Sequence, residues 1–232
     1  TLTDSCTDIF HASDITSLPS QLSARKYKFV ITVHDMIPFL FTNSYMKEQP
    51  FDYQFALKHG LELLKEADAI ITHIPNCPIA VLTADCVPIT IYDPIKHVTG
   101  LVHAGRMGTQ KNILTKTIEA FSREYGSSPK DLIMGMGPAI RGCCYEVNES
   151  SALPFIKKYS LCSKFIKKTE KNKFFLDLPM INRLEGCKAG VLTENIYADG
   201  PCTVCENHRW YSYRKEGKTG RLITLAMLQS RE

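Results

Sequence analysis

Residues 79–104 read IAVLTADCVPITIYDPIKHVTGLVHA, and this stretch decides the fold. Two runs of mainly apolar residues, 79–92 and 98–102, flank the segment Asp-Pro-Ile-Lys at 93–96. That segment is typical of a type I turn with proline at its second position. The pattern therefore predicts a β-hairpin built from two buried strands.

Two side chains of this hairpin can carry chemistry. With Pro94 and Ile95 at the centre of the turn, Cys86 is expected directly opposite His103, with Cβ atoms about 4.5–5.5 Å apart. A thiolate and an imidazole at that distance can share a transition-metal ion, zinc or copper above all. They can equally form a nucleophile–base pair. Asp85, beside Cys86, is a candidate general base or ligand-orienting residue. Spacing alone leaves these interpretations open, together with a purely structural role for a buried cysteine.

The rest of the chain mixes strands and helices without strict alternation. Beyond the hairpin, short strand candidates lie at 27–34, 69–72, 132–136, 174–178, 191–196 and 222–225, and helices are expected at 53–66, 110–125 and 155–165. We therefore expect one domain over residues 1–232, of the α/β or α+β class, with a mixed sheet. The glycine-bearing turn after His103 runs into the helix at 110–125, which predicts an anion site at that helix N-terminus.

Composition narrows the classes of function. The 232 residues are 44% hydrophobic and 22% charged, with a net charge of +4 and no basic run. Such a chain is globular, and nucleic acid is not its expected ligand, whereas a small anionic substrate suits the weak positive charge. Because the sequence has neither a stretch long enough to span a bilayer nor the order of a signal peptide, no membrane association is expected. Nine cysteines, spread through apolar segments, favour free thiols in a reducing cytoplasm.

Three segments, in this order, resemble the signatures of the YfiH/LACC1 family, once called laccase-domain or multicopper polyphenol oxidase proteins. They are TADCVPI at 83–89, VHAG at 102–105 and GPAIRGCCYEV at 137–147. Further matches lie at 67–72, 202–203, 211–214 and 219–221. The resemblance covers about residues 67–225, and a segment of about 1–50 is divergent.

The resemblance implies a fold, a metal and an activity. The fold would be a mixed-sheet sandwich similar to some cysteine hydrolases, with one zinc, or alternatively copper, bound by one cysteine and two histidines. Members phosphorolyse adenosine, inosine, guanosine and methylthioadenosine, and hydrolytically deaminate adenosine. By residue match, Cys86 and His103 are two ligands. The third lies upstream, and His34 fits its context best, with His59 and His73 as alternatives.

The same resemblance suggests how substrate is held. Arg214 and Arg221 stand in the matching C-terminal motifs and are candidates for binding phosphate. The family usually has Trp-Arg after His-Ala-Gly, whereas this chain has Arg106-Met107, so Arg106 is a candidate to supply the displaced guanidinium. The expected partners are a purine nucleoside and phosphate, in a monomer or homodimer.

Three other functions remain open. Cys86 and His103 could form a metal-free hydrolase of the kind that edits cell-wall peptides, or the changed turn at Arg106-Met107 could leave a silent nucleoside-binding protein. A copper oxidase of phenols ranks low, because one cysteine and two histidines cannot supply several copper centres.

Cysteines near the C-terminus form a partial zinc-knuckle pattern. Cys202 and Cys205 are followed by His208, but no fourth ligand is evident from the sequence. One of the adjacent Cys143 and Cys144 is interpreted as pocket lining, because a disulfide between neighbours is not expected in a reducing compartment.

Overall fold

The computed structural model describes residues 9–12, 28–33, 68–159, 165–169 and 172–229. The helix predicted at 53–66 and the candidate ligands His34 and His59 lie outside these residues.

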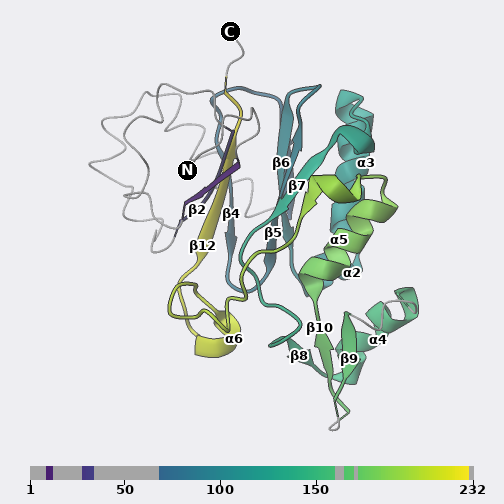
Figure 1. Cartoon of the computed structure of the whole chain (residues 1–232), viewed down its shortest axis with the longest axis vertical. Coiled ribbons are helices and arrows are strands. Elements are labelled where there is room, and N and C mark those ends of the chain that lie inside the picture. The colour runs from purple at the N-terminus through teal and green to yellow at the C-terminus, as the bar shows by residue number, and fades with distance from the viewer. Residues whose placement is uncertain (1–8, 13–27, 34–67, 160–164, 170–171, 230–232) are drawn as a thin grey trace.

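Two sheets form the centre of the described structure (Figure 1). The four-stranded sheet has the order β1 (Ile9–Ala12), β2 (Lys28–Val33), β12 (Leu222–Met227), β4 (Ile79–Thr83). The five-stranded sheet has the order β11 (Ile196–Tyr197), β7 (Ile133–Met136), β5 (Val87–Asp93), β6 (Val98–Ala104), β3 (Ala69–Thr72). A small third sheet has the order β8 (Glu146–Val147), β10 (Phe174–Leu176), β9 (Ile166–Lys168).

Helices cover the face of the five-stranded sheet that points away from β4 and β12 (Figure 1). The covering helices are α2 (Arg106–Gln110), α3 (Ile113–Tyr125) and α5 (Leu178–Lys188). Outside this layer, α4 is Glu149–Lys158 and α6, which lies below β12, is Tyr213–Glu216; short 3-10 turns occur at Pro129–Asp131 and Thr193–Asn195. The layers are thus sheet, sheet and helix, and the small sheet and α4 project at one end. The predicted mixed α/β fold is confirmed.

The apolar core lies on both faces of the five-stranded sheet. On one face, Ile89 and Val102 meet Ile118 and Phe121 of α3, and all four are at most 1% exposed. On the other face, a smaller cluster joins the two sheets and consists of Ile79, Val81, Leu101 and Ala226. Since β5 and β6 are buried on both faces, their sequences are continuous apolar runs without alternation.

The sequence predicts strands at 79–83 and 87–92, the second continuing the first; both strands form, but the predicted continuity is wrong. The two strands, β4 and β5, belong to different sheets and are separated by a bend at 84–86. The bend passes through Asp85, whose φ of 81° is unusual for a residue other than glycine. Asp and Asn tolerate this region better than most residues. The bend carries Asp85 and Cys86 to the edge where the two sheets meet.

The hairpin forms as predicted, but its register differs by two residues. Asp93 pairs with Val98, and Pro88, not Cys86, lies opposite His103. The cause is the turn, because Asp93 Oδ1 accepts hydrogen bonds from the backbone N–H groups of residues 95 and 96, at 2.8 and 2.9 Å. Residue 97 has a φ of 55°, so a four-residue loop replaces the expected two-residue turn. Because the shift is even, each side chain keeps its predicted face.

The segment after the hairpin also departs from expectation. The predicted helix at 110–125 begins only at Ile113, and a separate five-residue helix, α2, precedes it. Asn112, with a φ of 63°, separates the two helices. A helix as short as α2 does not provide the predicted anion site.

Helix α5 was missed, and part of it lies in the segment predicted as a strand at 174–178. The strand ends at Leu176, and Asp177 then caps the helix by accepting a hydrogen bond from the backbone N–H of Met180 at 3.2 Å. An Asp two residues before Pro179 is a recognisable start signal for a helix. The other short segments are partly confirmed: α4 ends at Lys158 before most of the predicted 155–165, and only the end of 191–196 is a strand.

A buried carboxylate joins three helices. Glu185 of α5 is 5% exposed and accepts hydrogen bonds from Tyr159 Oη at 2.7 Å and Thr115 Oγ1 at 2.9 Å. Lys158 Nζ lies 3.1 Å from the same carboxylate. Burial by itself would raise the pKa of Glu185, but these three partners prevail and hold the pKa below its usual range.

We expect Glu185→Gln to lower the free energy of unfolding by about 1–3 kcal/mol at neutral pH, since a charged acceptor is lost. A lowered folded-state pKa contributes stability above the unfolded pKa, about 4.3, and this contribution is lost as the pH falls through the folded value. The difference between wild type and variant should therefore shrink on acidification. Urea unfolding at pH 7 and pH 3 measures it, with exposed Glu119→Gln as the control. An equal loss at both pH values would exclude the charge as the cause.

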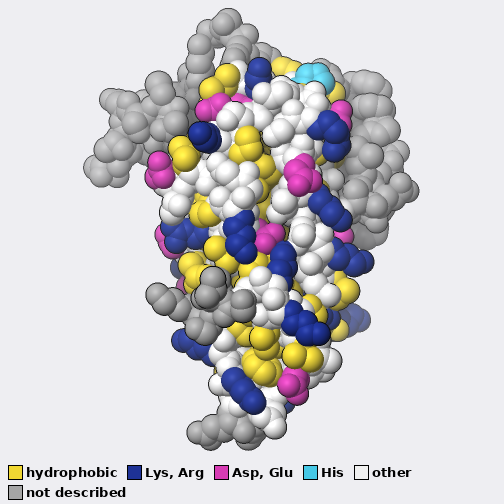
Figure 2. Space-filling model, turned by 90° about the vertical axis from the view of Figure 1, so that its right-hand side faces the viewer, with side chains coloured by type: hydrophobic (Ala, Val, Ile, Leu, Met, Phe, Trp, Pro, Cys, Tyr) yellow, Lys and Arg dark blue, Asp and Glu magenta, His cyan; other side chains and the backbone are white. Residues whose placement is uncertain are grey.

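The outer face of the helix layer carries Lys and Arg side chains interspersed with Asp, Glu and apolar side chains (Figure 2). Among the described residues, none of the helices is both long enough and apolar enough to cross a bilayer.

Candidate metal centre

The corrected register places Cys86 beside the end of β6. Continuing the ladder one step beyond Val87 and Ala104 brings Cys86 opposite Gly105. A Cβ added to Gly105 would lie 3.0 Å from Cys86 Sγ and 3.8 Å from His103 Nε2. The thiol and the imidazole nitrogen therefore flank one point, which is open only because residue 105 has no side chain. A sulfur and a nitrogen so placed suit zinc, which takes cysteine and histidine ligands.

Asp68 orients the histidine. His103 Nδ1 lies 3.3 Å from Asp68 Oδ1, and the backbone N–H of His103 donates to the Asp68 carbonyl at 2.8 Å. With Nδ1 facing a carboxylate, Nε2 is left to face Cys86. This carboxylate–histidine arrangement is the one commonly found behind metal-bound histidines.

Both carboxylate oxygens of Asp85 accept hydrogen bonds. Oδ1 accepts a hydrogen bond from Thr203 Oγ1, and Oδ2 accepts one from the backbone N–H of Arg214, each at 2.6 Å. The backbone carbonyl of Asp85 also accepts from the N–H of Ile140 at 2.9 Å. Asp85 is 8% exposed, so from inside the protein it joins the loops at Ile140 and Thr203 to helix α6.

The surroundings of Cys86 raise the pKa of its thiol. Burial raises the pKa of Cys86, and the nearby charges of Asp85 and Asp68 raise it further, while Arg221 acts in the opposite direction. A nucleophilic cysteine usually has a lowered pKa. The electrostatics thus favour a thiol that ionises on binding a metal over one that acts as a free nucleophile.

The three candidate arginines lie around the same edge. The charge of Arg106 acts to lower the pKa of the Tyr145 hydroxyl, and the guanidinium carbon of Arg214 lies 5.0 Å from the centre of the Tyr145 ring. Burial raises the pKa of Tyr145 although both arginines oppose the shift. Cys86 is close enough to affect the same hydroxyl, and Arg221 is close enough to affect Cys86. Tyr145 therefore connects the arginines to the metal-ligand pair.

The strand register argues against His73 as the third ligand. His73 follows the end of β3 at Thr72, which pairs with Thr99, whereas Asp68 at the start of β3 contacts His103. At about 3.3 Å per residue, His73 lies some 16 Å along the strand from that point. His73 is exposed and contacts the ring of Tyr125 instead, at 5.4 Å between centroids.

Sequence reasoning missed several residues of this site. Asp68, Tyr145 and Thr203 were quoted only as parts of matching motifs, without roles. Asp68 could have been found once 69–72 was paired with 98–102, but Thr203 is 118 positions from Asp85 and carries no local signal.

The fold and the cysteine–histidine pair together define a mixed α/β protein with a candidate metal centre at the strand ends. A family model described as "Multi-copper polyphenol oxidoreductase laccase" matches residues 18–229, and the chain belongs to this family.

The relatives carry a different activity in their names. "Purine nucleoside phosphorylase YlmD" of Bacillus subtilis is 36% identical over 167 residues, which are 69% of this chain and 58% of the relative. A purine nucleoside phosphorylase of Clostridium acetobutylicum is 35% identical over 182 residues, covering 78% of this chain and 74% of that protein. Human "Purine nucleoside phosphorylase LACC1" is 30% identical over 154 residues, covering 65% of this chain and 35% of that protein.

Solved structures agree with the fold. The YfiH protein of Bacillus licheniformis has a TM-score of 0.66 at 33% identity, covering 70% of this chain and 62% of that one. YlmD from Geobacillus stearothermophilus has a TM-score of 0.66 at 30% identity, with 70% and 61% covered. The YfiH/LACC1 resemblance is thereby confirmed. The chain spans less than two thirds of the length of the Bacillus subtilis relative.

Proposed function

We propose that this chain is a metal-dependent purine nucleoside phosphorylase with its metal at Cys86 and His103. The observation that carries the proposal is the convergence of Cys86 Sγ and His103 Nε2 on the open side of Gly105, with Arg106 and Arg214 acting on nearby Tyr145 and Arg221 on Cys86. The names of the relatives support the reaction class. The match over 18–229 supports a single domain over most of the chain.

For the third ligand we propose His34. What supports it is the register of the four-stranded sheet. Strand β2 ends at Val33, which pairs with Ile223, and Ile223 pairs with Leu82 of β4. Strands β2 and β4 therefore end at the same edge, shortly before Cys86. His59 stays an alternative outside the described residues.

Phosphorolysis gives each described group a task. Phosphate attacks C1′ of the ribose, the bond from C1′ to the purine nitrogen breaks, and the base leaves with that electron pair and takes up a proton. Arg106, Arg214 and Arg221 would bind the phosphate and balance its charge. A zinc ion at the site would supply further positive charge as a Lewis acid. Tyr145 would help to position the guanidinium groups of Arg106 and Arg214.

Asp85 was a candidate general base, and its contacts support a positioning role. Both its oxygens accept hydrogen bonds at 2.6 Å, which fixes the backbone at Arg214 and the loop at Thr203 relative to Cys86. A proton carried on either oxygen would disrupt one of these bonds. We therefore propose that Asp85 holds Arg214 beside the ligand pair.

The finer activities rest on the family resemblance. We propose adenosine, inosine, guanosine and methylthioadenosine as substrates, with hydrolytic deamination of adenosine as a second reaction. Zinc is the proposed metal, with copper the alternative, because one thiolate with imidazoles suits both. A cytoplasmic location is supported by the seven described cysteines, all of which are free thiols.

The proximity of His103 Nε2 to the thiol keeps a cysteine hydrolase as the second candidate. Iodoacetamide followed by peptide mapping separates the two functions. A metal-bound Cys86 is protected and reacts only after chelation, whereas a nucleophilic Cys86 reacts at once. Immediate labelling of Cys86 in metal-loaded protein would favour the hydrolase.

We expect Asp68→Asn to weaken metal binding at the Cys86–His103 site by about 10–100-fold, with the fold retained. The neutral amide oxygen accepts a weaker hydrogen bond from Nδ1–H than a carboxylate does, so the orientation and basicity of His103 suffer. Competition with a zinc indicator measures the affinity, and exposed Asp199→Asn is the matched control. Unchanged affinity in Asp68→Asn would remove Asp68 from the site.

A further inference from the structure

Four cysteines gather outside the site described above. Within the described residues, Cys143, Cys144, Cys202 and Cys205 are the group with the spacing of a metal site, and all four sulfurs lie within 4.8 Å of one another. Cys143 Sγ and Cys144 Sγ each lie 3.5 Å from Cys205 Sγ. The sequence alone indicated Cys202 and Cys205 as candidate zinc ligands, but not Cys143 and Cys144.

These distances match a tetrahedral thiolate site and not a disulfide. Zinc–sulfur bonds of about 2.3 Å place the four sulfurs of a tetrahedron roughly 3.8 Å apart. A disulfide bond is only about 2.05 Å long. Two of the observed sulfur–sulfur distances are 3.5 Å, and none exceeds 4.8 Å. The distance expected around zinc, roughly 3.8 Å, lies within this range. Closing around an ion requires only small side-chain movements.

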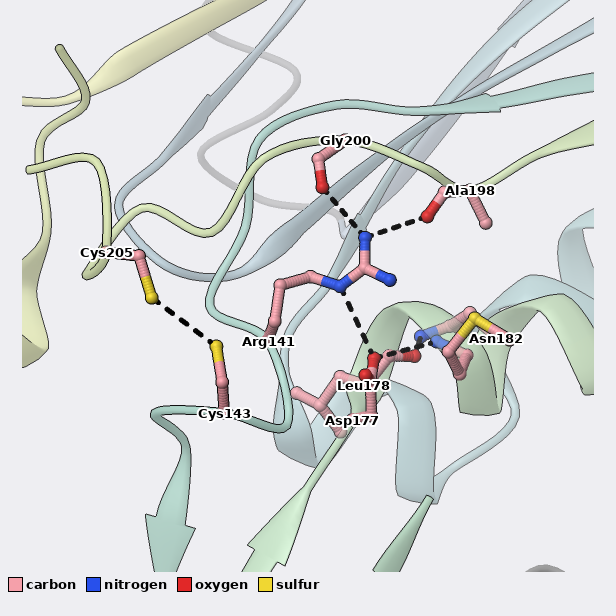
Figure 3. A network of polar contacts seen from close by, with 9 residues as sticks. Arg141, Cys143, Asp177, Leu178, Asn182, Ala198, Gly200 and Cys205 are labelled. Atoms are coloured by element: carbon pink, nitrogen blue, oxygen red, sulfur yellow. Dashed lines mark hydrogen bonds and ion pairs between the residues drawn. The ribbon is translucent and has the colours of Figure 1, made fainter. Parts of the chain in front are cut away.

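Two loops are tied together to form the cluster (Figure 3). One follows β7 and carries Cys143 and Cys144, and the other follows β11 and carries Cys202 and Cys205. They are linked by a bridge between Ala139 and Cys202. Arg141 reinforces the link, because its Nη1 donates to the carbonyls of residues 198 and 200, each at 2.8 Å. The loops are thus held before any ion binds.

The local backbone turns the cysteine sulfurs towards one another. Neighbouring residues of a strand point to opposite faces. Here a turn, in which the N–H groups of Cys144 and Tyr145 both donate to the Arg141 carbonyl at 2.9 Å, lets both adjacent thiols face Cys205. Backbone N–H groups of Arg141, Val204 and Cys205 act to lower the pKa of the Cys202 thiol. Such N–H donors stabilise a thiolate bound to a metal.

We propose that Cys143, Cys144, Cys202 and Cys205 bind one zinc ion as a second, structural metal site. Four thiolates in tetrahedral geometry are the ligand set that closes the coordination sphere of zinc and leaves no position for substrate.

The position of this site explains what it would stabilise. Tyr145, whose ring contacts Arg214 and whose pKa Arg106 acts to lower, directly follows Cys144. Thr203, which donates to Asp85, directly follows Cys202. An ion that fixes these two loops would hold the residues that surround the Cys86–His103 pair, at a distance from the reaction itself.

The test uses protein with Cys86→Ala, so that the other metal site does not contribute. Zinc analysis of this protein, purified without chelator, should give about one ion per chain. Adding Cys205→Ser should reduce zinc to near zero and lower the melting temperature. Adding Cys205→His should retain the ion, since histidine is also a zinc ligand. Adding Cys187→Ser, which changes a thiol on α5, should leave zinc unchanged.

Cobalt replacement gives a reading that does not depend on stability. Tetrahedral thiolate–cobalt should give strong charge-transfer absorption in the Cys86→Ala protein, and this absorption should be lost in Cys86→Ala/Cys205→Ser. Zinc-free Cys86→Ala protein in which all four thiols are alkylated would overturn the proposal. So would a zinc-free protein with two fewer reactive thiols, which would indicate a disulfide. Since Cys86 is absent throughout, failure here leaves the phosphorylase proposal untouched.

Discussion

Replacing Cys86 by alanine is expected to abolish metal binding at the Cys86–His103 site and to lower phosphorolysis by at least about 100-fold. The thiol is the only described sulfur that faces His103 Nε2 across Gly105, so its loss leaves the ion without its strongest ligand. Metal content and the release of hypoxanthine from inosine should fall together. Circular dichroism should show the fold unchanged, because alanine fits the space and removes no buried hydrogen bond.

The control for this experiment is Cys77→Ser, which changes a thiol on the loop before β4. It should retain both metal and activity. If Cys86→Ala kept full activity after losing the ion of the Cys86–His103 site, the assignment of the site would be wrong. If Cys86→Ala lost activity but still bound the ion of the Cys86–His103 site, the result would point instead to a nucleophilic cysteine.

The second large effect is expected from Gly105→Ala. The new methyl group would lie 3.0 Å from Cys86 Sγ, a separation that must be relieved by movement of the thiol. Since it would also lie 3.8 Å from His103 Nε2, it occupies the space between the two ligands. We expect metal affinity to fall by about 10-fold or more, with activity following.

Gly135→Ala is the matched control for Gly105→Ala. Gly135 lies in β7, and a Cβ added there would have no neighbour within 4 Å. Both variants add one methyl group, so a general effect of losing a glycine would appear in both. Equal metal affinity in Gly105→Ala and wild type would show that the ion does not lie at this point.

The hairpin shows how far sequence reasoning can reach. Its two strands, and the proximity of Cys86 and His103, follow from apolar runs and turn residues. The register does not, because the carboxylate of Asp93 bonds to two N–H groups and closes a longer loop than the proline alone suggests. The ligand pair survives this error because a shift of two residues keeps each side chain on its face.

The contacts around the Cys86–His103 pair could not be predicted from local sequence patterns. The division of 79–92 into two strands depends on Asp85, whose bend is stabilised by Thr203 and Arg214 from distant parts of the chain. Likewise, Cys143 and Cys144 join Cys205 only because β7 and β11 are parallel neighbours whose loops leave the sheet together. Helix α5, by contrast, had a local signal in Asp177 and Pro179 that could have been used.

The name of the family and the names of its relatives describe different chemistry. The family model refers to a multi-copper laccase, whereas the relatives are called purine nucleoside phosphorylases. The described site favours the second, because a single cysteine–histidine pair surrounded by arginines suits one ion and an anionic substrate.

The most direct test of the central claim is phosphate-dependent cleavage of inosine by metal-loaded protein. Release of hypoxanthine and ribose 1-phosphate in equal amounts, absent without phosphate and lost in Cys86→Ala, is the predicted result. Hypoxanthine release that is independent of phosphate, or undiminished in Cys86→Ala, would contradict a phosphorylase built on this metal centre.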